Sequence, residues 1–486
     1  MTFAAFGILF TMKERLKKLD ELRQKGICPY PYEFERTHTF AEIRDNFENL
    51  SRSEKIVASC GRILTIRGHG KTIFVTVGDE YSKMQIYLRQ DRLGDKFGLF
   101  RLFDIGDFIG ISGKVFKTKT DEMTILVDDI IMLSKALQPL PEKWHGLKDI
   151  EIRYRKRYLD LIANTEVREI FKKRAQLITF IRKFLDDRGF VEMETPILQP
   201  IYGGGAANPF KTYYNALEQD MFLRIADELY LKRLIVGGYE KVYEVCRDFR
   251  NEGIDRHHNP EFTMLEAYEA YTDYRGMMEL VESLFDYLLE NLVGSHSLRF
   301  VDREVEFGKP LKRIKYVDAL NNKIGFDILS SGDEDIDKVC EGCGIDYKTI
   351  SKGAKIDKLF SELIQKEIIE PTFVIDYPKI ISPLAKEHRN DERLVERFEL
   401  IMFGIELGNA FSELNDPAEQ RRRFEDQLSR KEEGISEIDE DFLEALEYGM
   451  PPTGGLGIGI DRLCMVFFNQ PSIRDVILFP QLKKQK

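Results

Sequence analysis

The chain has 486 residues, of which 43% are hydrophobic and 32% are charged, and its formal net charge is −11. This composition is typical of a soluble globular protein, and the length allows two or more domains. The six scattered cysteines form no disulfide framework, which excludes a small disulfide-stapled protein and suits the cytoplasm. Cys340 and Cys343 lack a matching second pair, so free thiols are favoured over a metal or redox site.

Residues 1–55 are predicted to be an N-terminal extension followed by a helical segment. The first eleven residues are mostly apolar, but they lack a basic leader and are too short to span a bilayer. A charged helical pattern begins at Met12, so we interpret Met12, rather than Met1, as the translation start. Elsewhere no segment approaches 18 uninterrupted apolar residues, which predicts no membrane span.

Residues 56–138 contain short β runs in which apolar and polar residues alternate, with turn residues between the runs. A helical segment over 92–100 precedes the fourth run. Five strands with a helix in this position predict an OB-fold barrel. The five runs are residues 56–64, 72–77, 84–88, 108–115 and 123–127.

Charge is distributed unevenly along the chain. Residues 1–145 hold 23 lysines and arginines against 20 acids, a net charge of +3, so the remainder carries −14. The overall negative charge argues against nucleic acid as a partner, whereas the positive net charge of residues 1–145 is compatible with RNA binding by that part alone.

Pro139 and Pro141 predict a linker over residues 139–149, and the pattern changes to long helices from residue 150 onward. Helices are predicted over 167–188, ending at Gly189, and over 277–292. Strand-like runs lie between them, with hairpin turns predicted at Gly237-Gly238 and around Gly253. Residues 330–370 are charged and helical, and we interpret them as an insertion in a catalytic domain that spans 150–486.

Residues 247–262 concentrate side chains that suit a nucleotide. Arg250 can grip a phosphate with two donors, Glu252 can accept from an amino group of a base, and Phe262 can stack on that base. Residues 454–462 add a glycine-rich apolar strand that ends in Arg462, and the chain has no GxxxxGK[ST] phosphate loop. The alternatives are an exposed charged turn for the first segment and a core strand with a structural salt bridge for the second.

The two segments resemble motifs 2 and 3 of the class II aminoacyl-tRNA synthetases, and residues 189–196 resemble their motif 1, including Pro196. Residues 201–206, 226–232 and 406–416 resemble the lysine-specific branch, and the similarity covers residues 12–480. The resemblance implies an α+β protein, with an OB-fold anticodon-binding barrel and a catalytic domain built on an antiparallel six-stranded sheet flanked by helices. It also implies an ATP-dependent ligase that forms lysyl-adenylate, releases pyrophosphate and transfers the lysyl group to the 3′ end of tRNA-Lys.

The same resemblance implies roles for single residues. Arg250 would bridge the α-phosphate and the amino acid carboxylate, and Arg462 would reach the γ-phosphate; both would be catalytic. Glu399 and Glu406 would hold Mg²⁺, about three ions per site, although two acids seven apart in a helix-like stretch otherwise indicate a solvated face. The implied ATP-binding residues are Arg250, Glu252, His258, Asn259, Phe262, Glu399, Glu406 and Arg462.

The implied lysine pocket needs buried acceptors for an ammonium group. Glu228 and Glu413, with Tyr268, match the pocket for the ε-amino group, although Glu228 taken singly could equally be a helix-surface acid. Gly205 departs from the family pattern, in which alanine is usual, and this leaves the rigidity of the loop open. The implied lysine-binding residues are Gly204, Glu228, Glu266, Tyr268, Asn409 and Glu413, and the implied anticodon-binding residues are Arg67, Phe74, Gln85 and Glu122.

For Phe74 alone, packing in the barrel core is an equal alternative to stacking on a base. Motif 1 implies a homodimer. A sister enzyme for aspartate or asparagine would need cations where this chain has Glu228 and Glu413. A lysyl-transferase paralogue that modifies elongation factor P would lack the barrel, and a non-enzymatic RNA-binding scaffold would not need Arg250, Glu252 and Arg462.

Overall fold

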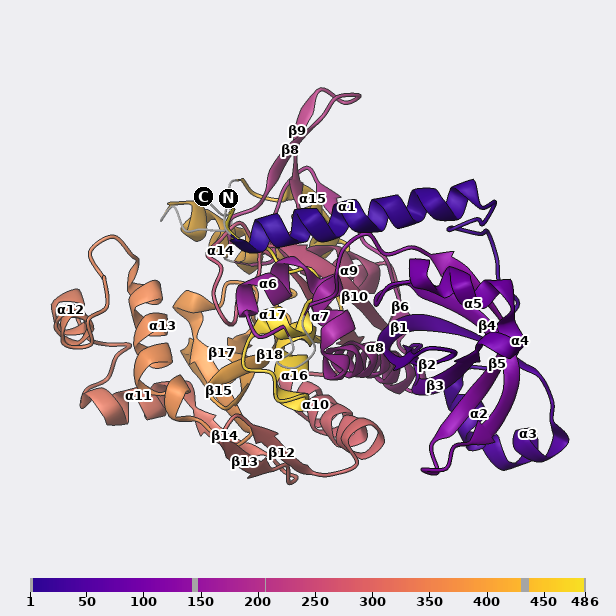
Figure 1. The fold of residues 1–486 in the computed structure, drawn as a ribbon. Coiled ribbons are helices and arrows are strands. Elements are labelled where there is room, and N and C mark those ends of the chain that lie inside the picture. Colours follow the sequence, from indigo (N-terminus) through magenta and orange to yellow (C-terminus); the bar gives the residue numbers. More distant parts are fainter. Residues whose placement is uncertain (1–2, 142–146, 206, 430–436, 485–486) are drawn as a thin grey trace. The chain divides into compact units, whose positions relative to one another are not determined.

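The computed structural model describes residues 3–141, 147–205, 207–429 and 437–484. Ala206, in the segment that resembles the lysine-specific branch, lies outside these residues. The chain divides into two compact units, residues 1–148 and 149–486, and each contains hydrophobic core residues of its own (Figure 1). None of the helices in the described part of the chain combines the length and apolarity that a membrane span requires.

The first unit is a closed five-stranded barrel preceded by helices, which confirms the predicted OB-fold. The strands follow one another around the barrel in the order β1-β2-β3-β5-β4, and two short helices precede β4. The elements are α1 (Phe3–Gln24), α2 (Phe40–Asp45), α3 (Phe47–Ser53), β1 (Val57–His69), β2 (Thr72–Gly78), β3 (Lys83–Arg89), α4 (Gln90–Leu93), α5 (Asp95–Leu99), η1 (Phe100–Leu102), β4 (Phe108–Lys117) and β5 (Met123–Ser134).

The second unit is built on a large mixed sheet. Its six central strands run in the order β15-β17-β18-β19-β11-β10, with every neighbouring pair antiparallel, which confirms the predicted six-stranded antiparallel sheet. In the described residues, β14 and β6 extend this sheet in parallel at its two edges, and β16 pairs with β17. The sheet strands are β6 (Val191–Glu192), β10 (Lys241–Phe249), β11 (Glu261–Ala270), β14 (Lys312–Lys315), β15 (Thr372–Pro378), β16 (Glu387–His388), β17 (Asp391–Met402), β18 (Ile405–Ser412) and β19 (Thr453–Gly459).

Two smaller sheets, β7-β9-β8 and β12-β13, complete the strands of this unit in its described part. They comprise β7 (Leu198–Gln199), β8 (Lys211–Tyr214), β9 (Gln219–Leu223), β12 (Ser297–Phe300) and β13 (Arg303–Glu306). The helices are α6 (Ile150–Arg155), α7 (Arg157–Ala163), α8 (Thr165–Asp186), α9 (Glu228–Val236), α10 (Tyr274–Leu288), η2 (Leu289–Val293), α11 (Tyr316–Ile324), α12 (Asp333–Gly342), α13 (Lys352–Leu363), η3 (Gln365–Glu367), η4 (Lys379–Ile381), α14 (Pro417–Ser429), α15 (Glu440–Glu447), α16 (Ile460–Phe467) and α17 (Ile473–Val476).

Helices α8, α10 and α16 pack on one face of the central sheet, and the other face carries the candidate site residues beside two smaller buried clusters that include residues of α9, α11, α13 and α15. Leu265 and Ala267 of β11 and Leu456 and Ile458 of β19 join α8, α10 and α16 in one buried cluster. Side chains alternate between the two faces of a strand, so the intervening residues of the same strands face away from these helices. The candidate site residues of β11, β17 and β18 belong to this second set.

Two sequence interpretations are wrong. Gly237-Gly238 is not a hairpin turn, because helix α9 ends at Val236 and Gly238, with φ of +102°, leads from the helix into β10. Glu399 and Glu406 do not lie in a helical stretch. They lie on β17 and β18, two antiparallel strands joined at Phe403-Gly404, where both residues have positive φ. The sequence of this hairpin is highly charged and contains few β-branched residues, so its pattern does not indicate strands.

Candidate active site

The β10–β11 hairpin brings the predicted base-stacking and phosphate-binding residues together. Asp248 pairs in register with Phe262, and Arg250 follows β10 directly. The Arg250 guanidinium carbon lies 5.1 Å from the centre of the Phe262 ring, and both side chains are partly exposed. Glu252 is exposed in the connecting loop. This surface offers a ring, a cation and a carboxylate to a nucleotide.

Motif 3 meets motif 2 through Arg462. A guanidinium nitrogen of Arg462 donates to His258 Nε2 at 3.1 Å, while His258 Nδ1 lies 2.8 Å from the Asp255 carboxylate. The other terminal nitrogen of Arg462 donates to Glu406 Oε2 at 2.9 Å. Asn259 is buried. Its side-chain nitrogen donates to the carbonyl of Glu261, and its side-chain oxygen accepts from the backbone N–H of Gln481. It therefore holds the loop in this structure.

Glu399 and Glu406 lie on neighbouring strands of one sheet, and each carboxylate pairs with an arginine. Arg397 donates to Glu399 at 2.7 Å, and Arg462 pairs with Glu406. Burial and the nearby Glu406 raise the pKa of Glu399 to about 7. Burial opposes ionisation of Glu406 as well, but Arg462, Arg397 and Arg250 lower its pKa overall. Carboxylate oxygens are hard donors, and two carboxylates on neighbouring strands fit a divalent cation such as Mg²⁺.

The predicted ε-amino pocket contains two buried carboxylates. Glu228 is the first residue of α9 and is 6% exposed, which excludes the alternative of a helix-surface acid, and Glu413 is 1% exposed. Lys232, one turn further along α9, is completely buried and forms ion pairs with both, at 2.5 Å from Glu228 Oε1 and with Glu413 Oε2. Burial and the nearby Glu228 raise the pKa of Glu413 to about 8, although Lys232 opposes this shift.

Strand β11 supplies the next part of the pocket. Tyr268 and Glu266 share one face of the strand, and the Tyr268 hydroxyl donates to Glu266 Oε2 at 3.0 Å. Burial, together with the negative charges of Asp227 and Glu228, raises the pKa of Glu266 well above its usual range. A positively charged group would relieve this cost, so the site suits an amine.

Glycines of β19 make room for these acids. A Cβ at Gly455 would lie 1.9 Å from Glu413 Oε1 and 2.6 Å from Tyr268 Cε1, and a Cβ at Gly457 would lie 2.8 Å from Glu266 Oε1. The glycine-rich strand is therefore neither simple core nor a phosphate loop, because its bare face lets three pocket side chains approach the backbone.

Gly204 and Asn409 complete the predicted lysine-binding set. Gly204 has φ of +83°, and a Cβ there would meet Ala226 Cβ at 3.1 Å. Asn409 lies opposite Glu399 in the β17–β18 pairing, and its side-chain oxygen accepts from Arg397 Nε at 2.8 Å. A Cβ at Gly205 would be 3.8 Å from Arg250 Nη2, so an alanine fits where the family usually has one.

Two arginine networks were missed by the sequence analysis. Arg397 donates to both Glu399 and Asn409. Arg397 and Glu399 are two residues apart, which places them on the same face of a strand, and this spacing was the signal available in the sequence. Arg224 is buried against Glu244, at 2.9 Å, and Asp248, at 3.3 Å. The nearby Asp227 carboxylate has no hydrogen-bond partner among the described residues, and burial raises its pKa well above the usual range.

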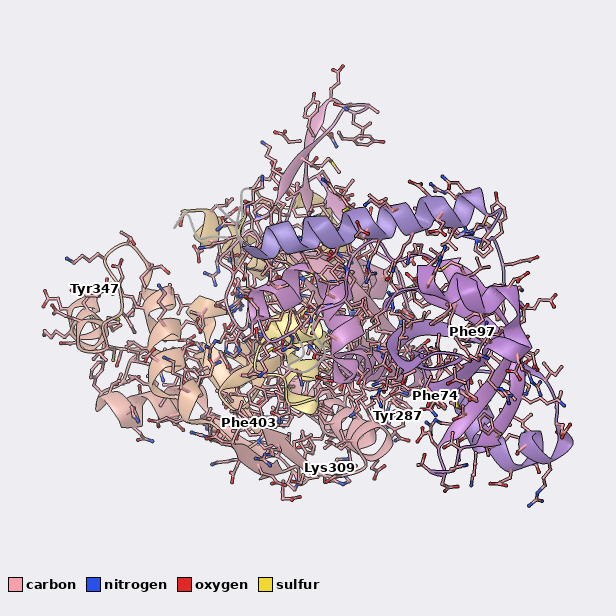
Figure 2. The ribbon with its side chains drawn as sticks, viewed as in Figure 1. Phe74, Phe97, Tyr287, Lys309, Tyr347 and Phe403 are labelled. Atoms are coloured by element: carbon pink, nitrogen blue, oxygen red, sulfur yellow. The ribbon has the colours of Figure 1, made fainter. Side chains whose placement is uncertain are left out.

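The predicted anticodon residues lie on the outer surface of the barrel. Phe74 is labelled in Figure 2. It pairs in register with Arg67 and alternates with the buried Val75, and its ring stacks on Tyr87 at 4.4 Å between centroids. Phe74 is therefore not a barrel-core residue. Gln85 donates to Thr124 at 2.9 Å, and Arg67 and Glu122 are exposed. Tyr87, which lengthens this aromatic surface, was not predicted.

Comparison with known proteins agrees with this geometry. The family model described as tRNA synthetases class II (D, K and N) matches residues 149–483, and the model described as OB-fold nucleic acid binding domain matches residues 57–133. The lysine–tRNA ligase of Thermotoga maritima is 51% identical over 483 residues, covering 98% of this chain and 96% of the relative.

Two further relatives are similar over comparable lengths. The lysine–tRNA ligase of Carboxydothermus hydrogenoformans is 51% identical over 97% of this chain and 98% of its own length. Lysine–tRNA ligase 2 of Methanosarcina mazei is 50% identical over 97% of this chain and 94% of its own length. The chain therefore belongs to the lysine–tRNA ligases, class II synthetases with an N-terminal OB-fold domain.

Proposed function

We propose that the chain activates L-lysine with ATP and transfers the lysyl group to the 3′ end of tRNA-Lys. The observation that carries this assignment is the buried pair Glu228 and Glu413, in the same unit as the Arg250–Phe262 and Arg462–His258 contacts. An ammonium group on a long apolar stem needs such a pair, whereas an aspartate side chain would need cations there.

In the first step, a carboxylate oxygen of lysine forms a bond to the α-phosphorus of ATP, and the bond from that phosphorus to pyrophosphate breaks. The protein mainly has to position the reactants and offset charge. Phe262 stacks on adenine and Glu252 accepts from its amino group. Arg250 holds the α-phosphate and the lysine carboxylate together, while Arg462 and His258 hold the outer phosphates.

Glu399 and Glu406 would hold Mg²⁺ beside the phosphates, with Arg397 orienting Glu399. When bound, Mg²⁺ supplies positive charge to the phosphate oxygens. Glu406 keeps its ion pair with Arg462, which fixes that guanidinium toward the phosphates. From the family resemblance we expect about three Mg²⁺ ions per site.

The pocket places the rest of the lysine molecule. Glu266 and the Gly204 carbonyl accept from the α-amino group, Asn409 helps to hold the carboxylate, and Glu228, Glu413 and Tyr268 surround the ε-amino group. In the second step, a hydroxyl of the terminal ribose of tRNA attacks the lysyl carbonyl carbon and AMP leaves. Phe74, with Arg67, Gln85 and Glu122 around it, reads the anticodon of the same tRNA by stacking and edge contacts.

Two further properties belong to this proposal. The enzyme works as a homodimer through motif 1, in and directly after which Val191, Ile197 and Leu198 are each more than 40% exposed in the single chain. It works in the cytoplasm, a location that suits six cysteines none of which is paired with another.

The test is lysine-dependent exchange of pyrophosphate into ATP, with aspartate as the control amino acid. We expect exchange with lysine and none with aspartate. Glu228→Gln or Glu413→Gln should weaken lysine use by about 3–5 kcal/mol, because each removes charge from a desolvated ammonium site. The KM for ATP should change little in both variants. Glu252→Gln is the matched control, since it should raise the KM for ATP and leave the KM for lysine.

Exchange with aspartate in place of lysine would overturn the assignment. Lysine activation within a few-fold of wild type in either pocket variant would show that Glu228 and Glu413 do not form the ε-amino pocket.

A further inference from the structure

The lysine pocket already contains an ammonium group, that of Lys232. Lys232 is completely buried, and its Nζ contacts Glu228 Oε1 at 2.5 Å as well as Glu413 Oε2. Both carboxylates are those that the proposed function gives to the substrate ε-amino group. A buried lysine costs several kcal/mol to desolvate, so packing alone does not account for Lys232.

The charges of the pocket can be counted. Two carboxylates and the Lys232 ammonium leave one negative charge uncompensated, and one substrate ammonium would balance it. The other titratable groups around the pair include Tyr268 and Glu266 of β11 and Asp227, which directly precedes α9, and β19 presents Gly455 backbone at this point. Burial raises the pKa values of Asp227 and Glu266 well above their usual range. Burial raises the pKa of the Tyr268 hydroxyl well above its usual range, so this group stays neutral.

We propose that Lys232 is a specificity-determining residue: as the resident ammonium between Glu228 and Glu413, it leaves this pair with one unbalanced negative charge, so that one substrate ammonium completes a cluster of two carboxylates and two ammonium groups. The inference rests on the proposed function, because it takes Glu228 and Glu413 as the ε-amino pocket. A side chain without charge, such as that of norleucine, would leave the cluster unbalanced unless Glu413 bound a proton.

A dependence on pH follows. With the pocket empty, the Glu413 pKa is about 8, so at lower pH lysine binding must displace a proton from this carboxyl. The KM for lysine should therefore fall as pH rises toward 8 and then level off. Replacing Lys232 by methionine removes a cation that lowers the Glu413 pKa. The empty pair then shares a proton well above pH 8, and the substrate takes the place of the missing ammonium without displacing that proton.

The experiment measures the KM for lysine from pH 6.5 to 9 by pyrophosphate exchange, in wild type and in Lys232→Met. Between pH 6.5 and 8 we expect a fall of roughly tenfold in wild type and a flat profile in Lys232→Met. Dividing the two profiles cancels titration of free lysine and of Glu266, which both proteins share. Glu413→Gln, which removes the titrating acid, should also give a flat profile.

Two controls separate the possible causes. Lys241→Met removes a lysine of β10 that pairs with Glu269 outside the pocket, and its profile should match wild type. Thermal melting and the KM for ATP show whether Lys232→Met is folded and binds nucleotide. If Lys232→Met does not fold, the double variant Lys232→Met/Glu413→Gln, in which one carboxylate faces one substrate ammonium, is measured in its place, and its profile should also be flat.

Parallel profiles in wild type and Lys232→Met would overturn the inference while leaving the proposed function in place. A sloping profile in the double variant would overturn it as well. Absence of lysine-dependent exchange in wild type would instead be a failure of the proposed function, so the two failures can be told apart.

Discussion

At the scale of single residues, β19 shows how missing side chains shape a pocket. Gly455 and Gly457 face Glu413, Tyr268 and Glu266, and a Cβ at either position would lie less than 3 Å from one of the carboxylates. The same strand buries Leu456 and Ile458 on its other face. The alternation of glycine with apolar residues thus serves the pocket on one side and the core on the other.

Gly455→Ala should therefore damage lysine binding selectively. The added Cβ would lie 1.9 Å from Glu413 Oε1, so the carboxylate must move away from its position beside Lys232. We expect the KM for lysine to rise at least roughly tenfold and the free energy of unfolding to fall by about 1–3 kcal/mol, as in other overpacked sites. Steady-state pyrophosphate exchange and thermal melting measure the two effects.

Gly459→Ala, four residues along the same strand, is the matched control. A Cβ there would be 3.8 Å or more from its nearest neighbours, which belong to the Arg462 side chain. An equal loss of lysine affinity in both variants would contradict the proposed role of Gly455, because the effect would then come from strand flexibility.

Individual site residues differ in how far the sequence predicts them. Arg250, Glu252, Phe262 and Arg462 stand in motifs whose spacing indicates a nucleotide site. Lys232 lies inside a segment that resembles the family, but nothing in a sequence tells a buried lysine from an exposed one on an amphipathic helix. Its burial depends on Glu413, a residue 181 positions later that pairs with it only in the fold.

At the scale of elements, the barrel was predictable because apolar and polar residues alternate along much of its strands, as in β2 and β3. Val75 and Val77 of β2 are buried, while Phe74, the residue before Val75, lies on the outer surface of the barrel. The hairpin of β17 and β18 was not predictable in this way. Glu396, Arg397 and Glu399 give it a charged sequence, and their burial depends on partners such as Arg389 and Tyr377 from other elements.

Phe74→Ala tests the outer face of the barrel. Phe74 stacks on Tyr87 and is not in the barrel core, so its removal should change the melting temperature little. Loss of one stacked base should weaken tRNA binding by roughly 1–3 kcal/mol. Aminoacylation should fall accordingly, while lysine-dependent pyrophosphate exchange, which needs no tRNA, should stay unchanged.

Val75→Ala is the neighbouring control, since Val75 is 1% exposed and faces the core. It should lower the melting temperature where Phe74→Ala does not. Equal losses in aminoacylation and pyrophosphate exchange for Phe74→Ala would mean that the barrel has been misinterpreted.

At the scale of the whole molecule, the N-terminal part and the remainder of the chain differ in charge and form separate compact units. Residues 1–145 carry a net charge of +3 and the remainder −14, and the compact units meet at residues 148 and 149. The predicted ATP and lysine residues lie in the acidic unit and the predicted anticodon residues in the basic one. Recognition of tRNA and activation of lysine are thereby assigned to units with cores of their own.

The proposed homodimer is a prediction about the whole molecule, and it can be tested at the exposed apolar residues around motif 1. Around motif 1, Val191, Ile197 and Leu198 are 47%, 44% and 49% exposed, which is a costly arrangement unless another surface covers them. In a two-fold dimer each substitution occurs twice, so Leu198→Asp should weaken association by roughly a hundredfold or more. Light scattering should give twice the chain mass for wild type and a shift toward the monomer for Leu198→Asp. Tyr448→Asp, at a residue 82% exposed and outside motif 1, should remain dimeric. A wild-type protein that is monomeric and fully active at assay concentration would contradict the proposed homodimer.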